Sequence, residues 1–327
     1  MRDFSYLRAG SVEEALSAAA MPATMLLAGG TTLIDLAKCG VTEPERVVDI
    51  THLKGLDTIR IDAEGAFIGA LAKMSHVAAD AAVQSAFPAV SESLWQAASA
   101  QIRNMATIGG NLLQRTRCAY FRDPATFPAC NKRTPGSGCS ALEGVNRGHA
   151  VLGGSDTCIA IYPGDLAIAL VAFDAIVHLG DRKIAVDDFF LLPGTTPDKE
   201  HDLQPGEMIT AITIPASAAA RRSTYLKVRD RQSYEFAAAS AAVGIEFETD
   251  GKTIKDVRVA LGGVATKPWR ARTVEEALKG KALQTETVKT ASRLAVEGAV
   301  AHGANHYKIE LASRVIERAI LKMGALA

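Results

Sequence analysis

The sequence predicts an α+β protein, with two α/β segments followed by an antiparallel sheet that is backed by helices. In the first two thirds of the chain, short apolar runs alternate with stretches of helical spacing, as is typical of α/β units. After about residue 220, three β-type runs follow one another and the helical patterns come last. The chain has 327 residues, of which 48% are apolar, so it is long enough for two or three domains with their own cores.

Residues 1–57 are predicted to form the first α/β segment. Ser11 and Glu14 make a capping box, which marks the start of a helix. The segment is further expected to contain strands at 24–27 and 46–50 and a helix at 33–38.

Residues 58–215 are predicted to form the second segment, which opens with a hairpin at 58–61 and 66–68. Residues 215–220 (PASAAA) are interpreted as a linker to a third domain at 221–327. The other elements expected in the second segment are helices at 75–80, 88–101 and 165–173 and strands at 176–179 and 208–214.

The third domain is predicted to contain a three-stranded antiparallel sheet. Asp250 and Gly251 form a strong hairpin signal between its last two strands. The expected strands are 223–229, 238–247 and 253–261, followed by helices at 273–279, 286–301 and 308–323.

Charge and targeting signals restrict the class of protein. The chain carries 36 basic and 36 acidic side chains, so it has no long-range attraction for nucleic acid or an anionic membrane. Residues 1–10 lack the apolar stretch of a secretory signal, and the apolar run at 159–175 is broken by Pro163, Gly164 and Asp165. We therefore expect a cytoplasmic protein without a membrane span, which a signal-bearing partner would still be able to export.

Two glycine pairs, each flanked by threonine, are candidate binding elements. Gly29–Gly30 follows a predicted strand and precedes a predicted helix, where glycine lets backbone N–H groups approach a pyrophosphate. Gly109–Gly110 stands about eighty residues later, and the two pairs would clasp one extended dinucleotide from opposite sides. The spacing does not match G-x-G-x-x-G, and each pair is also compatible with an ordinary turn or helix end.

Four of the five cysteines lie within about forty residues, and Cys39 stands apart. Their spacing is unlike that of a zinc ribbon or a bacterial ferredoxin. A metal centre, buried structural thiols and redox-active pairs are all compatible with the set, which lies in an irregular, arginine-rich segment at 114–158. The four clustered cysteines are Cys118, Cys130, Cys139 and Cys158.

The sequence shows no acid–base constellation of a hydrolase. The histidines form no H-x-x-x-H pair, and no G-x-S-x-G element is present. Candidate redox sites without catalytic acid–base groups indicate an electron carrier.

Three motifs resemble the FAD-binding medium subunit of the xanthine dehydrogenase and carbon-monoxide dehydrogenase family, over essentially the whole chain. They are LAGGTTL at 27–33, IRNMATIGGNL at 102–112, and YLKVRDR at 225–231 with YEFA at 234–237. The cysteine-bearing segment is similar to the flavin subunit of bacterial periplasmic-type aldehyde oxidoreductases, which holds an additional 4Fe–4S cluster. In one departure from relatives, Gly164 stands before Asp165 where they usually have serine.

The resemblance implies a vanillyl-alcohol-oxidase-type FAD-binding fold, with FAD between the first two subdomains and the third closing over it. It places Asp165 at a cofactor hydroxyl or adenine-side group, and Lys227 near the flavin's N1–C2=O edge. It assigns Cys118, Cys130, Cys139 and Cys158 to the 4Fe–4S cluster, which we expect to be a structural clamp rather than a relay. The FAD-binding residues implied are Leu27, Ala28, Gly29, Gly30, Thr31, Thr32, Ala106, Thr107, Gly109, Gly110, Asn111, Asp165 and Lys227.

The implied function is electron transfer within a heterotrimeric molybdenum hydroxylase, with an aldehyde as the expected substrate. A large subunit would carry the molybdenum cofactor and a small subunit 2Fe–2S clusters, and this chain would pass electrons to NAD, a quinone, a ferredoxin or oxygen. Two alternatives are a stand-alone flavin oxidase of the same fold and a non-enzymatic scaffold with zinc on the cysteines.

Overall fold

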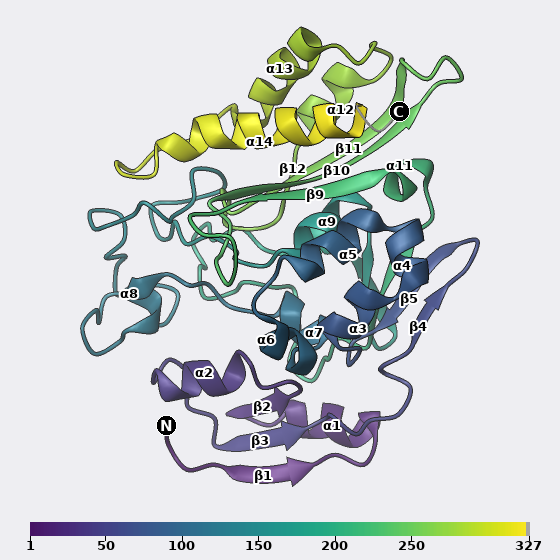
Figure 1. Cartoon of the computed structure of the whole chain (residues 1–327). Coiled ribbons are helices and arrows are strands. Elements are labelled where there is room, and N and C mark those ends of the chain that lie inside the picture. Colours follow the sequence, from purple (N-terminus) through teal and green to yellow (C-terminus); the bar gives the residue numbers. More distant parts are fainter. Residues whose placement is uncertain (325–327) are drawn as a thin grey trace.

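The computed structural model describes residues 1–324 and contains three sheets, one above the other in Figure 1. The last three residues of the predicted third domain, 325–327, lie outside the described residues. Within the described part, no helix is both long enough and apolar enough to cross a bilayer.

The N-terminal sheet has three parallel strands in the order β1-β3-β2. Its helix α1 begins as the capping box predicts, because the Ser11 side chain accepts a hydrogen bond from the Glu14 N–H. The first strand was not anticipated, since its four residues are mostly exposed and carry no apolar run. The elements are β1 Ser5–Arg8, α1 Val12–Ala19, β2 Thr24–Leu27, α2 Leu33–Lys38 and β3 Arg46–Asp49.

The middle sheet has five strands in the order β4-β5-β8-β6-β7, all paired antiparallel. Helix α9 is buried at every position and packs between this region and the C-terminal sheet. The strands are β4 Ile59–Ile61, β5 Gly65–Gly69, β6 Ile176–Leu179, β7 Arg182–Ala185 and β8 Ala211–Pro215. The helices are α3 Met74–Ala79, α4 Ala81–Ala86, α5 Pro88–Trp95, α6 Ala100–Met105, α7 Ile108–Leu112, α9 Leu166–Ala172 and α10 Val186–Phe189.

Two expected elements of this region are different in the structure. The helix predicted at 88–101 is broken, because Ala98 has a φ of 48° and Ser99 caps a new helix. The strand predicted at 208–214 begins only at Ala211.

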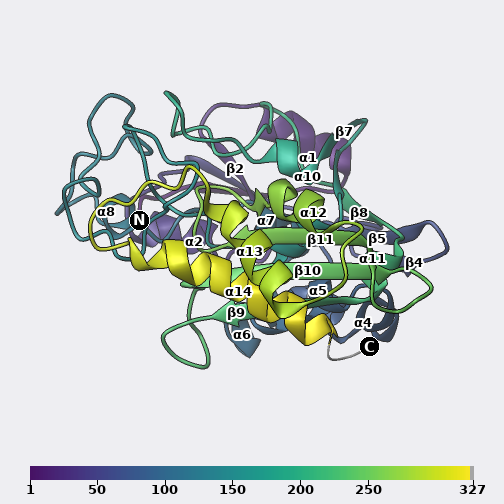
Figure 2. The ribbon, with the colours of Figure 1, turned by 90° about the horizontal axis from the view of Figure 1, so that it is seen from above.

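The C-terminal sheet has the order β12-β11-β10-β9, so the three predicted strands are joined by a short fourth one. Figure 2 shows α14 lying across this sheet. The predicted linker at 215–220 is wrong in part, because a short helix with buried Ala219 and Ala220 begins at Ala218. The elements are α11 Ala218–Arg221, β9 Ser223–Val228, β10 Ala239–Phe247, β11 Ile254–Gly262, β12 Trp269–Arg270, α12 Arg272–Leu278, α13 Thr285–Arg293, the 3₁₀ helix η1 Leu294–Val296 and α14 Tyr307–Gly324.

The cysteine-bearing segment at 114–158 is irregular as predicted, and its only helix is α8 Ala119–Arg122. It projects beside α2 and below the C-terminal helices (Figure 1). It shares a small apolar cluster with α2, in which Leu36, Phe121 and Cys130 are buried. Near its end, Val151 and Leu152 join the apolar core of the C-terminal domain.

Candidate functional site

The two glycine-bearing segments touch each other through their backbones. A Cβ on Gly29 would lie 2.2 Å from the carbonyl oxygen of Met105, so only glycine permits this approach. Gly30, with a φ of 71°, turns the chain from β2 toward α2. The first segment therefore ends directly against the second.

The second glycine pair lies on the short helix α7 rather than in an open loop. Thr107 caps this helix by accepting a hydrogen bond from the Gly110 N–H at 3.3 Å. Gly109 is buried against Ala70, whose Cβ would be 2.9 Å from an added Cβ. Gly109 therefore serves close packing, while Gly110 faces the space between the segments.

A cavity of about 1330 Å³ lies between these segments. Arg115 and residues 203–207 also line it, and sequence reasoning did not assign either to the site. Pro205–Gly206 is visible as a turn signal, but only the tertiary structure brings it to this cavity. The predicted binding residues that line the cavity are Ala28, Gly29, Gly30, Thr31, Thr32, Thr107 and Gly110.

A second cavity of about 480 Å³ shares Thr31, Thr32 and Gly110 with the first. Its wall includes the predicted residues Ala106, Asn111 and Asp165. The side-chain oxygen of Asn111 is buried and has no hydrogen-bond partner. Such an orphaned acceptor indicates a place for a donor from a bound molecule. The predicted residues that line neither cavity are Leu27, Gly109 and Lys227.

Asp165 and Lys227 form a buried ion pair. Lys227 Nζ lies 2.8 Å from Asp165 Oδ2, and the Tyr225 hydroxyl donates to Asp165 Oδ1 at 2.6 Å. Lys227 also donates to the Gln96 carbonyl at 3.0 Å. Burial raises the pKa of Asp165, while the Lys227 ammonium and the Tyr225 hydroxyl act against that shift. The two predicted residues are thus brought together, with Asp165 at the cavity wall and Lys227 behind it.

The four clustered cysteines line one cavity of about 290 Å³. The backbones of Cys130 and Cys139 pair as an isolated antiparallel bridge, which sets these two residues opposite each other. Burial raises the pKa of the Cys118 thiol to about 12 and also raises that of Cys158. Cys39 does not line this cavity, and all five cysteines are free thiols.

Two further observations describe the donor set. His149 Nε2 lies 3.2 Å from Cys118 Sγ, and burial lowers the pKa of His149 to about 4, so the imidazole is neutral. Within residues 1–324, no group of three or more His, Cys, Asp or Glu side chains is close enough together for a single metal ion.

The basic residues of the segment fasten it to the rest of the protein. Arg117 and Arg122 both pair with Asp35 on α2. Arg147 forms a bidentate ion pair with Asp230, with Nη1–Oδ2 and Nη2–Oδ1 distances of 2.9 and 3.2 Å. Most of the positive charge expected around the cysteines is therefore engaged by carboxylates.

Two family profiles together match almost the whole chain. The profile described as the FAD binding domain in molybdopterin dehydrogenase matches residues 2–217, and the CO dehydrogenase flavoprotein C-terminal domain matches residues 224–323. The chain belongs to the FAD-binding medium-subunit family of the xanthine and carbon-monoxide dehydrogenases. It is accordingly an oxidoreductase subunit of the molybdenum hydroxylase family. The family resemblance inferred from the glycine motifs is confirmed.

Individual relatives of this medium subunit match most or all of its length. The aldehyde oxidoreductase FAD-binding subunit PaoB of Escherichia coli is 42% identical over 335 residues, covering 100% of both chains. The glyceraldehyde dehydrogenase medium chain of Sulfolobus acidocaldarius is 30% identical over 88% of this chain and 85% of its own. Among solved structures, the carbon monoxide dehydrogenase of Hydrogenophaga pseudoflava aligns with a TM-score of 0.76 and 26% identity, covering 99% of this chain and 98% of that one. The predicted fold class is confirmed.

Proposed function

We propose that this medium subunit binds FAD at its glycine segments and a 4Fe–4S cluster in its cysteine segment, and carries electrons out of an aldehyde-oxidising molybdenum hydroxylase. The observation that carries the proposal is the convergence of four cysteines, spread over about forty residues, on one cavity. The full-length similarity to an aldehyde oxidoreductase FAD-binding subunit supports the choice of complex.

The glycine segments fit a dinucleotide. Gly29 leaves no room for a side chain, and the two cavities are adjacent, since Thr31, Thr32 and Gly110 line both of them. Residues 28–32 and 107–111 would hold the pyrophosphate and ribityl chain, and the orphaned Asn111 oxygen would accept a hydrogen bond from the cofactor. Bound FAD supplies electron storage that no side chain of the protein offers.

The buried ion pair gives the second cavity its electrostatic character. Asp165 would accept a hydrogen bond from the cofactor, and it holds the Lys227 ammonium 2.8 Å away. The Lys227 ammonium balances the charge of this carboxylate, so a bound molecule meets a neutral pair rather than an isolated buried anion. Because Tyr225 and Gln96 fix the pair in place, this hydrogen-bond acceptor is preorganised.

The four cysteines that line one cavity match in number and chemistry the thiolate ligands of a 4Fe–4S cluster. A cluster of several irons keeps its thiolate ligands farther apart than one ion does, so a shared cavity is the relevant test of fit. Coordination would remove the protons that burial otherwise retains on Cys118 and Cys158. We assign the cluster a clamping role, because the buried apolar side chains between residues 114 and 149 are only Phe121, Cys130 and Ala141.

The proposed complex has three kinds of subunit. A large partner with the molybdenum cofactor would oxidise the aldehyde, and a small 2Fe–2S partner would pass the electrons to this chain for delivery to an external acceptor. The relatives named as aldehyde oxidoreductase and glyceraldehyde dehydrogenase subunits support an aldehyde substrate. Residues 1–57, 58–215 and 221–327 are proposed as the domains of this chain.

The test is a visible spectrum of the full chain purified without oxygen, together with flavin, iron and acid-labile sulfide assays. We expect one FAD and about four irons per chain, the content of a single four-cysteine 4Fe–4S site. Cys139→Ser should lose iron and the broad visible absorbance. Cys39→Ser, outside the cavity, is the matched control and should keep both.

The possible outcomes separate the parts of the proposal. Flavin with zinc in place of iron would make the cysteine cavity a zinc site and contradict the cluster. If Cys139→Ser keeps about four irons per chain, Cys139 is not a ligand of the cluster. Absence of both flavin and iron in the wild-type chain would contradict the proposed function as a whole.

A further inference from the structure

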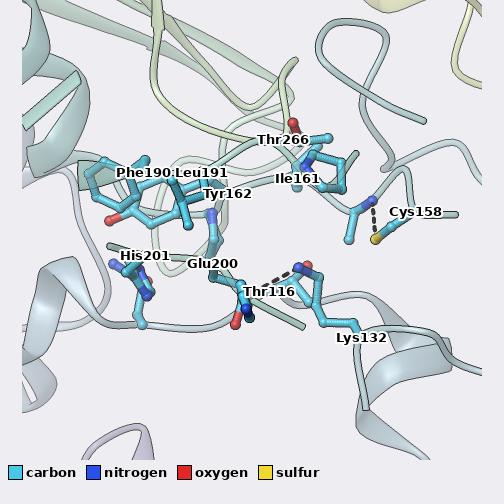
Figure 3. A pocket seen from close by; sticks show the side chains of 15 residues that line it. Thr116, Lys132, Cys158, Ile161, Tyr162, Phe190, Leu191, Glu200, His201 and Thr266 are labelled. Carbon is cyan, nitrogen blue, oxygen red and sulfur yellow. Dashed lines mark hydrogen bonds and ion pairs between the residues drawn. The ribbon is translucent and has the colours of Figure 1, made fainter. Parts of the chain in front are cut away.

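Three charged side chains form a chain of ion pairs between the two proposed cofactor sites. Glu200 Oε1 lies 3.1 Å from Lys132 Nζ, and its other oxygen pairs with Arg115 Nε. Figure 3 shows Glu200, Lys132 and Cys158 lining one cavity, of about 410 Å³. We name these three residues, Arg115, Glu200 and Lys132, the bridging triad.

The triad is largely shielded from water. The side chains of Lys132, Glu200 and Arg115 are 9%, 17% and 23% exposed. Burial alone would raise the pKa of Glu200, but Lys132 and Arg115 hold it below its ordinary value, so the carboxylate is charged at neutral pH. Two cations and one anion leave a net positive charge in a region where solvent screens little.

Each cation of the triad also lines one of the proposed sites. Lys132 is part of the wall of the cysteine cavity. Arg115 is part of the wall of the large cavity between the glycine segments. The Arg115 guanidinium also stacks 4.6 Å from the centre of the Phe121 ring, another wall residue of the cysteine cavity.

We propose that Glu200, which pairs with one cation at each cofactor site, moderates the positive charge that both cofactors experience. This inference rests on the proposed function, since it requires FAD and a cluster in the two cavities. Glu200 comes from the connection between α10 and β8, outside all the motifs that identify the family.

The sign of its effect follows from the contacts. Lys132 Nζ also donates to the Pro197 carbonyl at 2.8 Å, and Arg115 is stacked on Phe121. Both cations therefore remain in place when the Glu200 carboxylate is neutralised. Without its negative charge, the reduced and more negative form of each cofactor is stabilised.

The test is Glu200→Gln in the full chain, with flavin and cluster potentials measured by spectroelectrochemical titration. We expect both potentials to rise. The reduction equilibrium constants should change on the order of tenfold, about 59 mV for a one-electron couple and about 30 mV for a two-electron couple. Glu286→Gln removes the same charge from a side chain that is 82% exposed, on α13, and should shift neither potential.

A second variant gives the opposite sign and guards against a folding defect in the first. Lys132→Met leaves Glu200 paired with Arg115 and should lower the cluster potential, which a merely structural role would not produce. A Glu200→Gln shift that is absent, downward or confined to one cofactor overturns the inference. If Glu200→Gln does not fold stably, Lys132→Met alone decides. An unchanged or raised cluster potential in Lys132→Met then also overturns the inference.

Cofactor assays on the wild-type chain separate this inference from the proposed function. A wild-type chain with FAD but no iron contradicts the proposed cluster. In that case, only the effect of Glu200 on the flavin, through Arg115, remains to be tested. If the flavin potential of Glu200→Gln does not rise, the inference is overturned.

Discussion

At the scale of single residues, Gly29 has the most constrained position in the proposed FAD site. An added Cβ would meet the Met105 carbonyl oxygen at 2.2 Å, its carbon at 2.8 Å and the Ala106 Cα at 2.9 Å. All three are backbone atoms, so no side chain can rotate away to make room. The contact joins the two glycine segments along the cavity that both of them line.

Gly29→Ala is therefore expected to force the two segments apart. Overpacking of this kind costs about 1–3 kcal/mol of unfolding free energy, and the widened cavity should retain less FAD. The measurements are the ratio of flavin to protein after gel filtration and the unfolding free energy in urea. Gly148→Ala is the matched control, because an added Cβ there meets nothing within 4 Å. Equal flavin content and stability in Gly29→Ala and wild type would contradict this role.

At the scale of elements, sequence reasoning succeeded where a local signal and the burial pattern agree. Helix α1 begins at its capping box, and the hairpin of β10 and β11 turns at Asp250–Gly251, where Gly251 has a φ of 67°. Helix α9 is continuously apolar and wholly buried. In each case, nearby residues are sufficient to specify the structure.

Sequence reasoning failed where tertiary contacts override the local pattern. Residues 96–99 interrupt the predicted helix at 88–101, although their composition is compatible with a helix. The Gln96 carbonyl there accepts hydrogen bonds from Lys227 and Arg229, which come from distant sequence. Residues 215–220 look like a small-residue linker, yet α11 begins at Ala218 and packs against β10.

The cysteine segment is attached to α2 by ion pairs, which provides a test at this scale. Asp35 lies 3.1 Å from Arg117 Nη1 and also pairs with Arg122, whose side chain is only 17% exposed. Asp35→Asn should lower the free energy of local opening of the segment by about 1 kcal/mol, because these pairs are only partly buried. Amide hydrogen exchange in residues 116–133 of the full chain should then be about fivefold faster.

The matched control for this change is Glu310→Gln on α14, which removes a fully surface-located pair with Arg314. It should leave exchange in residues 116–133 unchanged. If Asp35→Asn behaves like the control, apolar contacts rather than ion pairs hold the segment.

At the scale of the whole molecule, the candidate sites combine segments that sequence reasoning cannot place next to one another. The glycine segments were found because each carries its own signal. Glu200 carries no signal and residues 203–207 carry only a turn signal, and both reach the two sites through the path of the chain between α10 and β8. The pairing of Asp165 with Lys227 also depends on the packing of the C-terminal sheet on α9.

His201 makes the stability of the whole molecule depend on pH. The ring of His201 lies 5.2 and 5.4 Å from those of Phe189 and Phe190, and its Nε2 is buried without a hydrogen-bond partner. Burial lowers the pKa of His201 from 6.5 to about 4. The folded protein therefore keeps this imidazole neutral at pH values where the unfolded chain already protonates it.

We expect the unfolding free energy to fall as the pH is lowered from 6.5 toward 4, since the unfolded state binds the extra proton in this window. For His201 alone, the loss between pH 6.5 and 5 is about 1.5 kcal/mol. His201→Phe should lack this part of the loss. Its stability relative to wild type should therefore be greater at pH 5 than at pH 6.5 by that amount. His52→Asn, at an exposed position, is the control and should follow the wild-type curve. The measurement is urea unfolding of the three proteins across this pH range. If the unfolding free energies of wild type and His201→Phe change with pH in parallel, the folded protein accepts a proton at His201 without cost.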